Sequence, residues 1–438
     1  MTTVSAFSGL QTSLRGLMAQ QRSLDVTAHN IANAQTEGYT RQEAVLGASI
    51  PLTISGGILA GGEGAQLGQG VDVLEFRRMR DSFLDLQYRA QNMALGDKST
   101  MADGLSRVEE QLGEPSDDAL SGLLGQFWDS WETLASNPTD PAAKATVIAR
   151  GQALTGALAD LDARLSALSG SAAAEYTSLT TGPGNEVGDY ASQLATLNTA
   201  IRDQMANGRQ PNDLLDQRDL VLDKLSQLGQ VSTSDTDGDG ALDVSFGGAT
   251  TLLVNGTTGA VTWPQTLTAP GGKLGALQAL QTTIAGYRTS LDGVAGSMAT
   301  AVNAIHGTPP FFTGTTAATL TVNVTVSTLQ ASTSGLAGDN DIARSIGALR
   351  AGSIDAAYAT FVHQVAGDAA DASRLSRTQE SIASTLDERR KSVSGVSLDE
   401  EMTNMIRFQR GYQASSRAMS TMDEMLDTLI NRTGRVGL

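Results

Sequence analysis

Both ends of this chain carry apolar residues at helical spacing. From Ser5 to Ala34 they recur every three or four positions, which predicts an amphipathic helix, and a second is predicted from Leu398 to Leu429. Periodicity leaves open whether these stripes bury each other within one chain or face neighbouring subunits. The stripes consist of Leu10, Leu14, Leu17, Leu24 and Ile31 at the first end and of Leu398, Met402, Met405, Gln409, Tyr412, Met419, Leu426 and Leu429 at the other.

The composition favours helix packing over a thick globule. Aromatic residues make up 4% of the 438-residue chain, although 40% is hydrophobic, so its cores must consist mainly of Ala, Leu, Val and Met. These residues suit helix–helix contacts. The length predicts about three domains at roughly 150 residues each.

The charge and the residue types exclude several classes of function. With 47 acidic and 30 basic residues the formal charge is −17, so neither nucleic acid nor an anionic membrane is an expected partner. The absence of cysteine excludes disulfides and cysteine-based zinc sites. The N-terminal residues lack a signal-peptide pattern and no uncharged apolar run reaches about 18 residues, so we expect no membrane span.

The first half of the chain is predicted to form a helical bundle. A glycine-rich segment, 48–70, is expected to be a loop or extended arm. A helix is then predicted from Phe76 to about Leu112, with Phe83, Leu86 and Met93 on one stripe.

Further helices follow this one. Asp140 and Pro141 are a strong N-cap and first-turn pair for a long helix towards Leu168. Segments 185–205 and 213–228 read as a helical hairpin. The helix that precedes Asp140 is expected to make buried aromatic and aliphatic contacts through Phe127, Trp128, Trp131 and Leu134.

The pattern then becomes β-rich and returns to helical. Short β-branched runs bounded by glycine predict strands, and helical spacing returns at 275–306 and 341–391. The fold class is therefore mainly α with a smaller β-rich insertion. We expect a terminal helical domain (1–45 plus 395–438), a helical-bundle domain (46–230 plus 335–394) and a β-rich domain (231–334) with an internal helix near 275–306. The predicted strands are 242–246, 250–255, 260–263 and 319–326.

One acidic loop resembles the start of a calcium site. Asp235, Asp237 and Asp239 alternate, with glycine at the sixth position, but Phe246 occupies the twelfth, where a bidentate Glu belongs. We favour an acidic hairpin turn, with weak calcium binding as the alternative.

No catalytic or cofactor motif is present, so no catalytic residue, metal or cofactor is predicted. His29, His306 and His363 lie far apart in the sequence and are expected to be surface or capping residues. The run Arg389–Lys391 is expected to be a solvated helix C-terminus rather than a binding patch.

Two motifs at opposite ends carry a family resemblance. Residues 28–34 (AHNIANA) and 36–42 (TEGYTRQ) resemble the N-terminal motif of flagellar rod, hook and hook-associated subunits. Residues 394–401 (SGVSLDEE), 408–414 (FQRGYQA) and 425–431 (MLDTLIN) are similar to the C-terminal helix of the same family. Residues 211–219 (PNDLLDQRD) resemble an internal helix start typical of the hook-associated members.

The resemblance implies an elongated structural subunit that is not an enzyme. Its terminal helices would pair as a coiled coil in an inner tube, followed by a helical bundle and an outer β domain. Assembly contacts would also come from Asn30, Asn33, Gly38, Tyr39 and Arg41. In such subunits the termini order on incorporation.

The resemblance also implies partners and a location. The chain would contact further copies of itself in a ring or helical layer, the flagellar hook protein and the next hook-associated protein towards the filament. A flagellar export chaperone would cover the C-terminal helix, and export would lead to the extracellular flagellum. The stretch 308–334 is short and low in complexity compared with longer relatives, which implies a reduced outer region. Another axial subunit, such as a hook or rod protein, and a secreted hydrolase or adhesive module on the flagellum are the alternatives.

Overall fold

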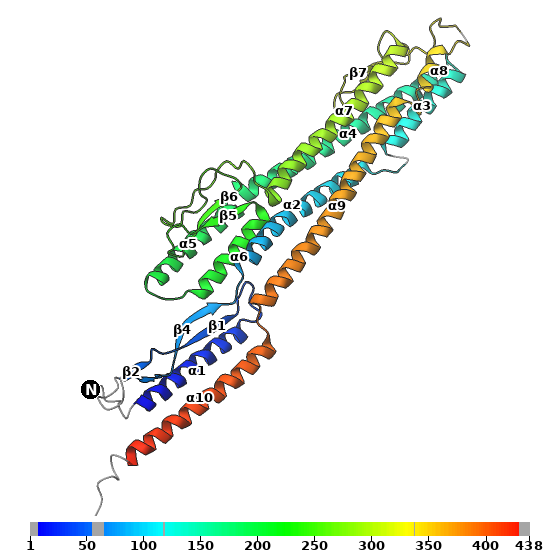
Figure 1. The fold of residues 1–438 in the computed structure, drawn as a ribbon. Coiled ribbons are helices and arrows are strands. Elements are labelled where there is room, and N and C mark those ends of the chain that lie inside the picture. Colours follow the sequence, from blue (N-terminus) through cyan, green and yellow to red (C-terminus); the bar gives the residue numbers. More distant parts are fainter. Residues whose placement is uncertain (1–7, 55–64, 117–118, 337, 429–438) are drawn as a thin grey trace, which may run out of the picture.

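The computed structural model describes residues 8–54, 65–116, 119–336 and 338–428. Figure 1 shows an elongated, mainly helical molecule with a long bundle at one end and a pair of helices at the other. The chain runs from the helix pair to the far end of the bundle and returns, so both ends of the described chain lie at the same end of the molecule. The prediction of a mainly α fold is confirmed.

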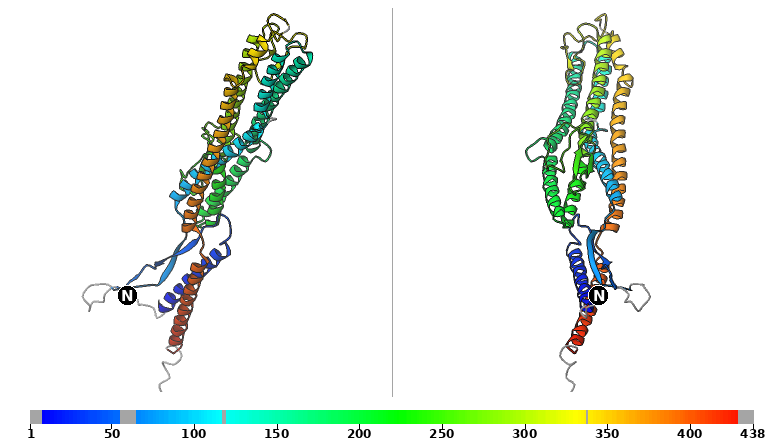
Figure 2. Two further views of the ribbon diagram at one scale, coloured as in Figure 1. Left: turned by 90° about the vertical axis from the view of Figure 1, so that its right-hand side faces the viewer. Right: turned by 60° about the vertical axis from the view of Figure 1, so that its left-hand side comes forward.

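Long antiparallel helices form the bundle. α2 packs against α7 and α9, while α4 packs against α3 and α7, and the short α8 covers α3 at the far end. The two views of Figure 2 show these helices running along the long axis of the molecule. Their bounds are α2 Ser82–Leu112, α3 Leu120–Ser136, α4 Pro141–Thr180, α7 Gly272–His306, α8 Asp341–Gly347 and α9 Ser353–Ser394.

Local capping explains where the bundle helices begin. Asp81 accepts hydrogen bonds from the backbone of Phe83 and Leu84 at the start of α2, and Asp140 accepts one from Ala142 with Pro141 in the first turn of α4. The predicted start of α4 is confirmed, but the helix continues to Thr180 instead of ending near residue 168.

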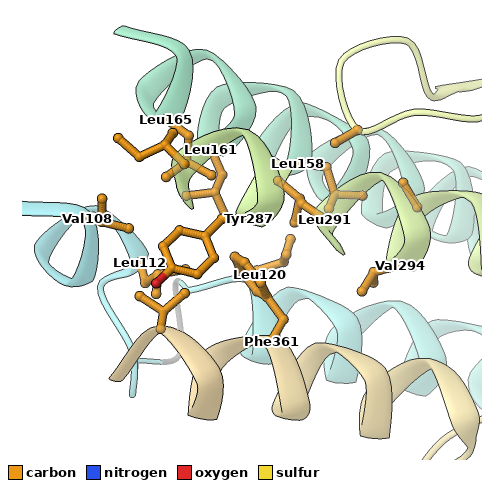
Figure 3. Packing of buried hydrophobic residues seen from close by; sticks show 14 of the residues in the cluster. Val108, Leu112, Leu120, Leu158, Leu161, Leu165, Tyr287, Leu291, Val294 and Phe361 are labelled. Carbon is orange, nitrogen blue, oxygen red and sulfur yellow. The ribbon is translucent and has the colours of Figure 1, made fainter. Parts of the chain in front are cut away.

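A continuous apolar core runs along the bundle. Around Tyr287 of α7, side chains from α2, α4 and α9 meet, and its ring lies edge-on to Phe361 at 6.3 Å. Each leucine that is fully buried in this way contributes about 1.5–3 kcal/mol. Figure 3 shows this packing, with Val108, Leu112, Leu120, Leu158, Leu161, Leu165, Leu291 and Val294 beside Tyr287 and Phe361.

An aromatic cluster fills the far end of the bundle. Phe127, Trp128 and Trp131 of α3 are completely buried, and Phe127 and Trp131 contact Phe311 at 5.8 and 5.3 Å between ring centroids. The predicted burial of these residues and of Leu134 is confirmed. His306 was expected to be a surface or capping residue. A surface position is wrong, because His306, the last residue of α7, is fully buried beside Trp131 and Phe311.

A separate outer β domain is not confirmed within the described residues. Segment 231–334 contains four short strands in two two-stranded sheets, and its long helix α7 packs inside the bundle against α2 and α4. The predicted strands at 250–255 and 260–263 are reduced to single bridges at Val254 and Val261. The strands are β5 Val231–Ser234, β6 Asp243–Phe246, β7 Phe312–Thr313 and β8 Thr321–Val322.

The predicted helical hairpin is confirmed. α5 (Glu186–Ala206) and α6 (Asn212–Leu228) pack against each other, and α6 also packs against α2. α6 thereby lies beside the end of the bundle that faces the helix pair (Figure 1).

The segment before α2 differs from the prediction. Its described residues form β strands, and the helix begins at Ser82 rather than Phe76. Val71–Arg78 pairs with β1 because its alternating side chains match a strand. Phe83 and Leu86 are also not buried in a stripe, since they are 64% and 61% exposed. The strands are β1 Gln42–Ala48, β2 Leu52–Ile54, β3 Ala65–Leu67 and β4 Val71–Arg78.

Candidate functional site

The terminal helices α1 (Ser8–Ala32) and α10 (Leu398–Asp427) lie side by side below the bundle (Figures 1 and 2). Their seam is narrow because small residues line it. A Cβ atom on Gly16 would lie 3.1 Å from the hydroxyl oxygen of Ser415. The buried residues of α1 are Ala19, Ser23, Thr27 and Asn30.

No large apolar side chain is fully buried in this seam within the described residues. Glu401 is the one buried residue of α10 in its described part, and Ala19 is the one buried hydrophobic residue of α1. A coiled coil built on the predicted stripes is therefore not confirmed, although the helices do pair. Two helices that share so small a core gain little stability from each other.

The predicted stripe residues divide between the seam and the surface. Leu10, Leu17, Leu24, Ile31, Met405, Met419 and Leu426 are partly buried, whereas Leu14, Leu398, Met402, Gln409 and Tyr412 are exposed. Leu429 lies outside the described residues. Met18, Ile406 and Met425 are also exposed, although they were not among the predicted stripe residues. Met18 and Ile406 each lie four residues beyond a predicted stripe residue, Leu14 and Met402, so continuing that spacing is the signal that would have found them.

The turn after α1 is held by Asn30. Its side-chain oxygen accepts hydrogen bonds from the Tyr39 hydroxyl (2.8 Å) and the Gln42 backbone N–H (3.0 Å). Its amide donates to the Gln42 carbonyl (2.9 Å) and to Glu401 of α10 (3.1 Å). Asn30 therefore uses all of its hydrogen-bonding capacity to join α1, the turn and α10.

Arg41 completes the contact with α10. Its Nε donates to Glu401 at 2.8 Å, and its backbone N–H donates to the carbonyl of Ser394 at the end of α9. Burial, together with the carboxylates of Asp213, Asp216 and Glu401, raises the pKa of Tyr39, so its hydroxyl remains a donor.

Other predicted assembly residues stabilise the same turn. Asn33 donates to the carbonyl of His29. Gly38 has a φ of +79°, and a Cβ atom there would lie 3.1 Å from Leu220 of α6. The position therefore favours glycine both for its conformation and for its close approach to α6.

A network of arginines and aspartates, which we call the polar joint, connects this turn to the bundle. Arg78 donates to Asp216 and Asp219 at 2.9 Å each, and Arg80 and Arg89 reach Asp219 at 3.1 and 3.0 Å. The complete set is Arg78, Arg80, Arg89 and Arg390 with Asp85, Asp216, Asp219 and Asp223, which come from β4, the connection from β4 to α2, and helices α2, α6 and α9.

The polar joint contains four arginines and four aspartates, so its formal charges cancel. Burial raises the pKa of Asp219, but Arg80, Arg78 and Arg89 outweigh it, so the pKa lies below its usual range. For Asp216, burial outweighs Arg78 and the pKa is raised. Buried ion pairs of this kind fix geometry more surely than they add stability.

The prediction for Arg390 is wrong. It was expected in a solvated helix end, but it donates to Asp223 at 2.5 Å and its guanidinium lies 4.1 Å from the centre of the Tyr88 ring. Arg390 is therefore part of the polar joint, whereas Arg389 and Lys391 are exposed as predicted.

The internal motif at 211–219 lies in this same joint. Asn212 donates to the carbonyl of Phe76, Asp213 accepts from Gln42, and Asp216 accepts from the backbone of Thr40. The three motifs of the sequence analysis therefore meet in space, although they lie far apart in the chain.

The acidic loop forms the connection of the β5–β6 hairpin. Asp235 accepts from the backbone of Gly238 and Gly240, and Asp237 accepts from Thr257. Asp239 accepts from Ala241. Among the described residues, no group of three or more His, Cys, Asp or Glu side chains is arranged to hold a metal ion.

The three histidines lie in different parts of the molecule. His29 is 3.3 Å from Asp213 near the joint, His306 is in the distal core, and His363 is exposed on α9. They form no common site. None of the helices in the described part of the chain combines the length and apolarity of a membrane span.

Family models match three parts of the chain. A model described as the flagellar hook-associated protein FlgK helical domain matches residues 105–320. Models for the flagellar basal body rod FlgEFG protein C-terminal and the flagella basal body rod protein match residues 392–432 and 10–40. Two terminal helices of the rod type around a hook-associated helical domain define an axial subunit of the bacterial flagellum.

A relative that matches nearly the whole chain identifies the family within this class of subunit. The flagellar hook-associated protein 1 of Bacillus subtilis is 30% identical over 98% of this chain and 99% of its own length. That of Salmonella typhimurium is 32% identical over 56% of this chain and 42% of its own length. A solved structure, the flagellar hook junction protein FlgK from Burkholderia pseudomallei, has a TM-score of 0.43 at 26% identity and covers 50% of this chain and 43% of its own. The chain belongs to the flagellar hook-associated protein 1 family.

Proposed function

We propose that this chain is a structural subunit of the bacterial flagellum at the junction between hook and filament. It would assemble through α1 and α10 and perform no catalysis. Membership of the hook-associated protein 1 family supports this role.

One observation carries the proposed mechanism. α1 and α10 pair along a seam of small residues and leave large apolar side chains facing outward on both helices. A pair without its own core needs neighbours to bury these side chains. The exposed set comprises Leu14, Met18, Leu398, Met402, Ile406, Tyr412 and Met425.

Neighbouring copies of the chain are the proposed partners for these faces. Residues 1–45 and 395–438 form the proposed assembly domain, and Asn30, Asn33, Gly38, Tyr39 and Arg41 hold its shape rather than contact neighbours directly. This division is supported by the hydrogen bonds of Asn30 and Arg41 within the chain.

Further partners follow from the family. They are the flagellar hook protein, the next hook-associated protein towards the filament, and an export chaperone on α10 that covers its apolar face before export. The location is the extracellular flagellum, reached through the flagellar export apparatus. A hook or rod protein is the less favoured identity, because the family model at residues 105–320 is that of a hook-associated helical domain.

Hydrogen exchange on the full chain tests the assembly mechanism. In the free chain, α1 and α10 should exchange fast while the bundle is protected, and both helices should become protected in isolated flagella. Strong protection of α1 and α10 in the dilute free chain would contradict the mechanism, because the two helices would then be stable without neighbouring copies.

Motility of a deletion strain tests the role. The full chain should restore attached filaments, whereas a variant with Met18→Asp and Ile406→Asp should fold but fail to restore them. Leu336→Asp is the matched control, because Leu336 is an exposed apolar residue far from α1 and α10. Normal filaments in the deletion strain would rule out the junction role.

A further inference from the structure

Methionine is concentrated in α10. Five of the 12 methionines in the chain lie within the 30 residues of this helix, whereas no other helix in the described part of the chain has more than two. The chain contains no cysteine, so thioethers are its most readily oxidised side chains. The five are Met402, Met405, Met419, Met422 and Met425.

The methionines differ in their access to solvent. Met402 and Met425 are 53% and 55% exposed, and Met18 of α1 is similarly open. Met298, in contrast, is fully buried in the core of the bundle. Among the exposed methionines that the structure describes, Met205 of α5 alone lies away from the helix pair. A dissolved oxidant therefore reaches three methionines of the helix pair much more easily than the core of the bundle.

A hydroperoxide oxidises such a thioether in a single two-electron step. The sulfur attacks the outer peroxide oxygen, the O–O bond breaks as the S–O bond forms, and the hydrogen of that oxygen moves to the leaving oxygen. The hydroperoxide is thereby reduced to water or an alcohol, and the sulfur is oxidised to a sulfoxide. A polar, chiral side chain then replaces a flexible apolar one.

These methionines lie on the surface that the proposed assembly has to bury. Met18 and Met402 lie among exposed apolar side chains, each four residues from another, Leu14 and Ile406. A sulfoxide oxygen that moves from water into an apolar contact loses its hydrogen bonds, which is unfavourable unless a donor replaces them. The core of the bundle is spared because Met298 is shielded. Oxidation therefore weakens contacts between chains without unfolding the bundle.

We propose that Met18, Met402 and Met425 form a reversible oxidation site, at which a hydroperoxide converts the exposed thioethers to sulfoxides and keeps the free chain from joining its neighbours. The inference rests on the proposed function and adds a chemical control of assembly. A methionine sulfoxide reductase reverses the reaction, because its dithiol is oxidised to a disulfide while the oxygen leaves as water and the thioether returns.

Peptide mapping of the purified full chain tests the chemistry. The chain is treated with hydrogen peroxide for increasing times, and the sulfoxide at each methionine is measured by mass spectrometry. Met18, Met402 and Met425 should react at least about ten-fold faster than Met298. Equal rates at Met402 and Met298 would overturn the proposed site.

Competition for isolated hooks tests the effect on assembly. The unmodified chain is partly oxidised, the peroxide is removed with catalase, and the mixture is added to hooks isolated from the deletion strain. Sulfoxide at Met18, Met402 and Met425 should be about ten-fold lower in the bound chain than in the unbound chain. Met205 is the internal control, and its sulfoxide level should be equal in the two fractions.

Two variants and a reductase treatment separate oxidation from other damage. Met402→Gln introduces a polar side chain of similar length without any oxidant and should bind the hooks about ten-fold less. Met205→Gln is the matched control and should bind as the unmodified chain does. Reductases for both sulfoxide epimers should restore binding of the unbound fraction.

The outcomes distinguish the oxidation site from the proposed function. Equal sulfoxide levels in the bound and unbound chain, unchanged binding of Met402→Gln, or a reductase treatment without effect overturns the oxidation site and leaves the proposed function standing. An unoxidised, unmodified chain that does not bind the hooks overturns both together.

Discussion

The side-chain amide of Asn30 donates a hydrogen bond of 3.1 Å to Glu401, a residue 371 positions further along the chain. Glu401 also accepts from Arg41 at 2.8 Å and is 2% exposed. One buried carboxylate thus links the N-terminal motif to the C-terminal helix. Since little apolar surface is buried between α1 and α10, polar contacts of this kind hold the pair in register.

Replacing this carboxylate should release α10. In Glu401→Ala, Asn30 and Arg41 lose their shared acceptor. We therefore expect the free energy of opening α10 to fall by about 2–4 kcal/mol, and not by more, because water still reaches part of Arg41. The bundle should keep its stability because its core is separate. Hydrogen exchange of α10 in the free chain measures the change, and it is followed at millisecond times because α10 is protected much more weakly than the bundle.

Glu400→Ala is the matched control for this prediction. Glu400 neighbours Glu401 and pairs with Arg41 at 3.3 Å, but its side chain is 64% exposed. Its removal should alter the exchange of α10 by less than about 1 kcal/mol. Equal effects of the two substitutions would show that the burial of Glu401 does not determine how strongly it holds α10 in place.

The polar joint should be sensitive to the loss of Asp219. This carboxylate contacts Arg78, Arg80 and Arg89, so Asp219→Ala leaves three largely buried guanidinium groups with fewer partners. We expect a loss of about 2–4 kcal/mol in the free energy of unfolding, measured with urea. Asp371→Ala removes an exposed ion pair with Arg374 and should change it by no more than about 0.5 kcal/mol.

Stability should fall in mild acid because of His306. Its Nδ1 lies 2.8 Å from the carbonyl of Pro309, and its Nε2 accepts from the backbone of Gln330 at 3.1 Å, so the ring is held neutral. Burial lowers its pKa below 6.5, against the opposing effect of the Pro309 carbonyl. The folded state then binds fewer protons than the unfolded state below pH 6.5, so this stability is present above the unfolded pKa and is lost as the pH falls through the folded pKa.

The variant His306→Gln separates this effect from other acid-sensitive groups. It should be less stable than the unmodified chain at neutral pH, but its unfolding free energy should decline less between about pH 7.5 and 5. His363→Gln, at an exposed position of α9, is the control. Parallel pH profiles for the unmodified chain and His306→Gln would refute the assignment.

Local signals explain the parts of the fold that the sequence predicted well. The start of α4 follows from Asp140 and Pro141 alone, and the α5–α6 hairpin follows from periodicity and a short turn. Trp128 and Trp131 were predicted to make buried contacts, and both are completely buried. None of these predictions depended on which helices pack against each other.

Long-range relations could not be predicted in this way. Asp219 is one of 47 acidic residues, and only the fold brings it to Arg78 and Arg89. Apolar spacing at Phe83 and Leu86 identified a stripe but not whether this chain would cover it. The assembly site was predicted as a set of stripe residues, whereas the described structure adds that its seam consists of small and polar residues.

Helix packing can be tested with two glycine substitutions that differ only in surroundings. Gly96 of α2 is buried against α6, and a Cβ atom there would overlap the backbone carbonyl oxygen of Gln227. That oxygen cannot move away without shifting α6, so Gly96→Ala should destabilise the chain by about 1–3 kcal/mol, despite the helix propensity of alanine. Gly170 of α4 has no atom within 4 Å of its Cβ position, and Gly170→Ala should stabilise the chain by about 0.5–1 kcal/mol. Urea unfolding of both variants gives the comparison, and a stabilising effect of Gly96→Ala would mean that α2 and α6 do not pack so closely.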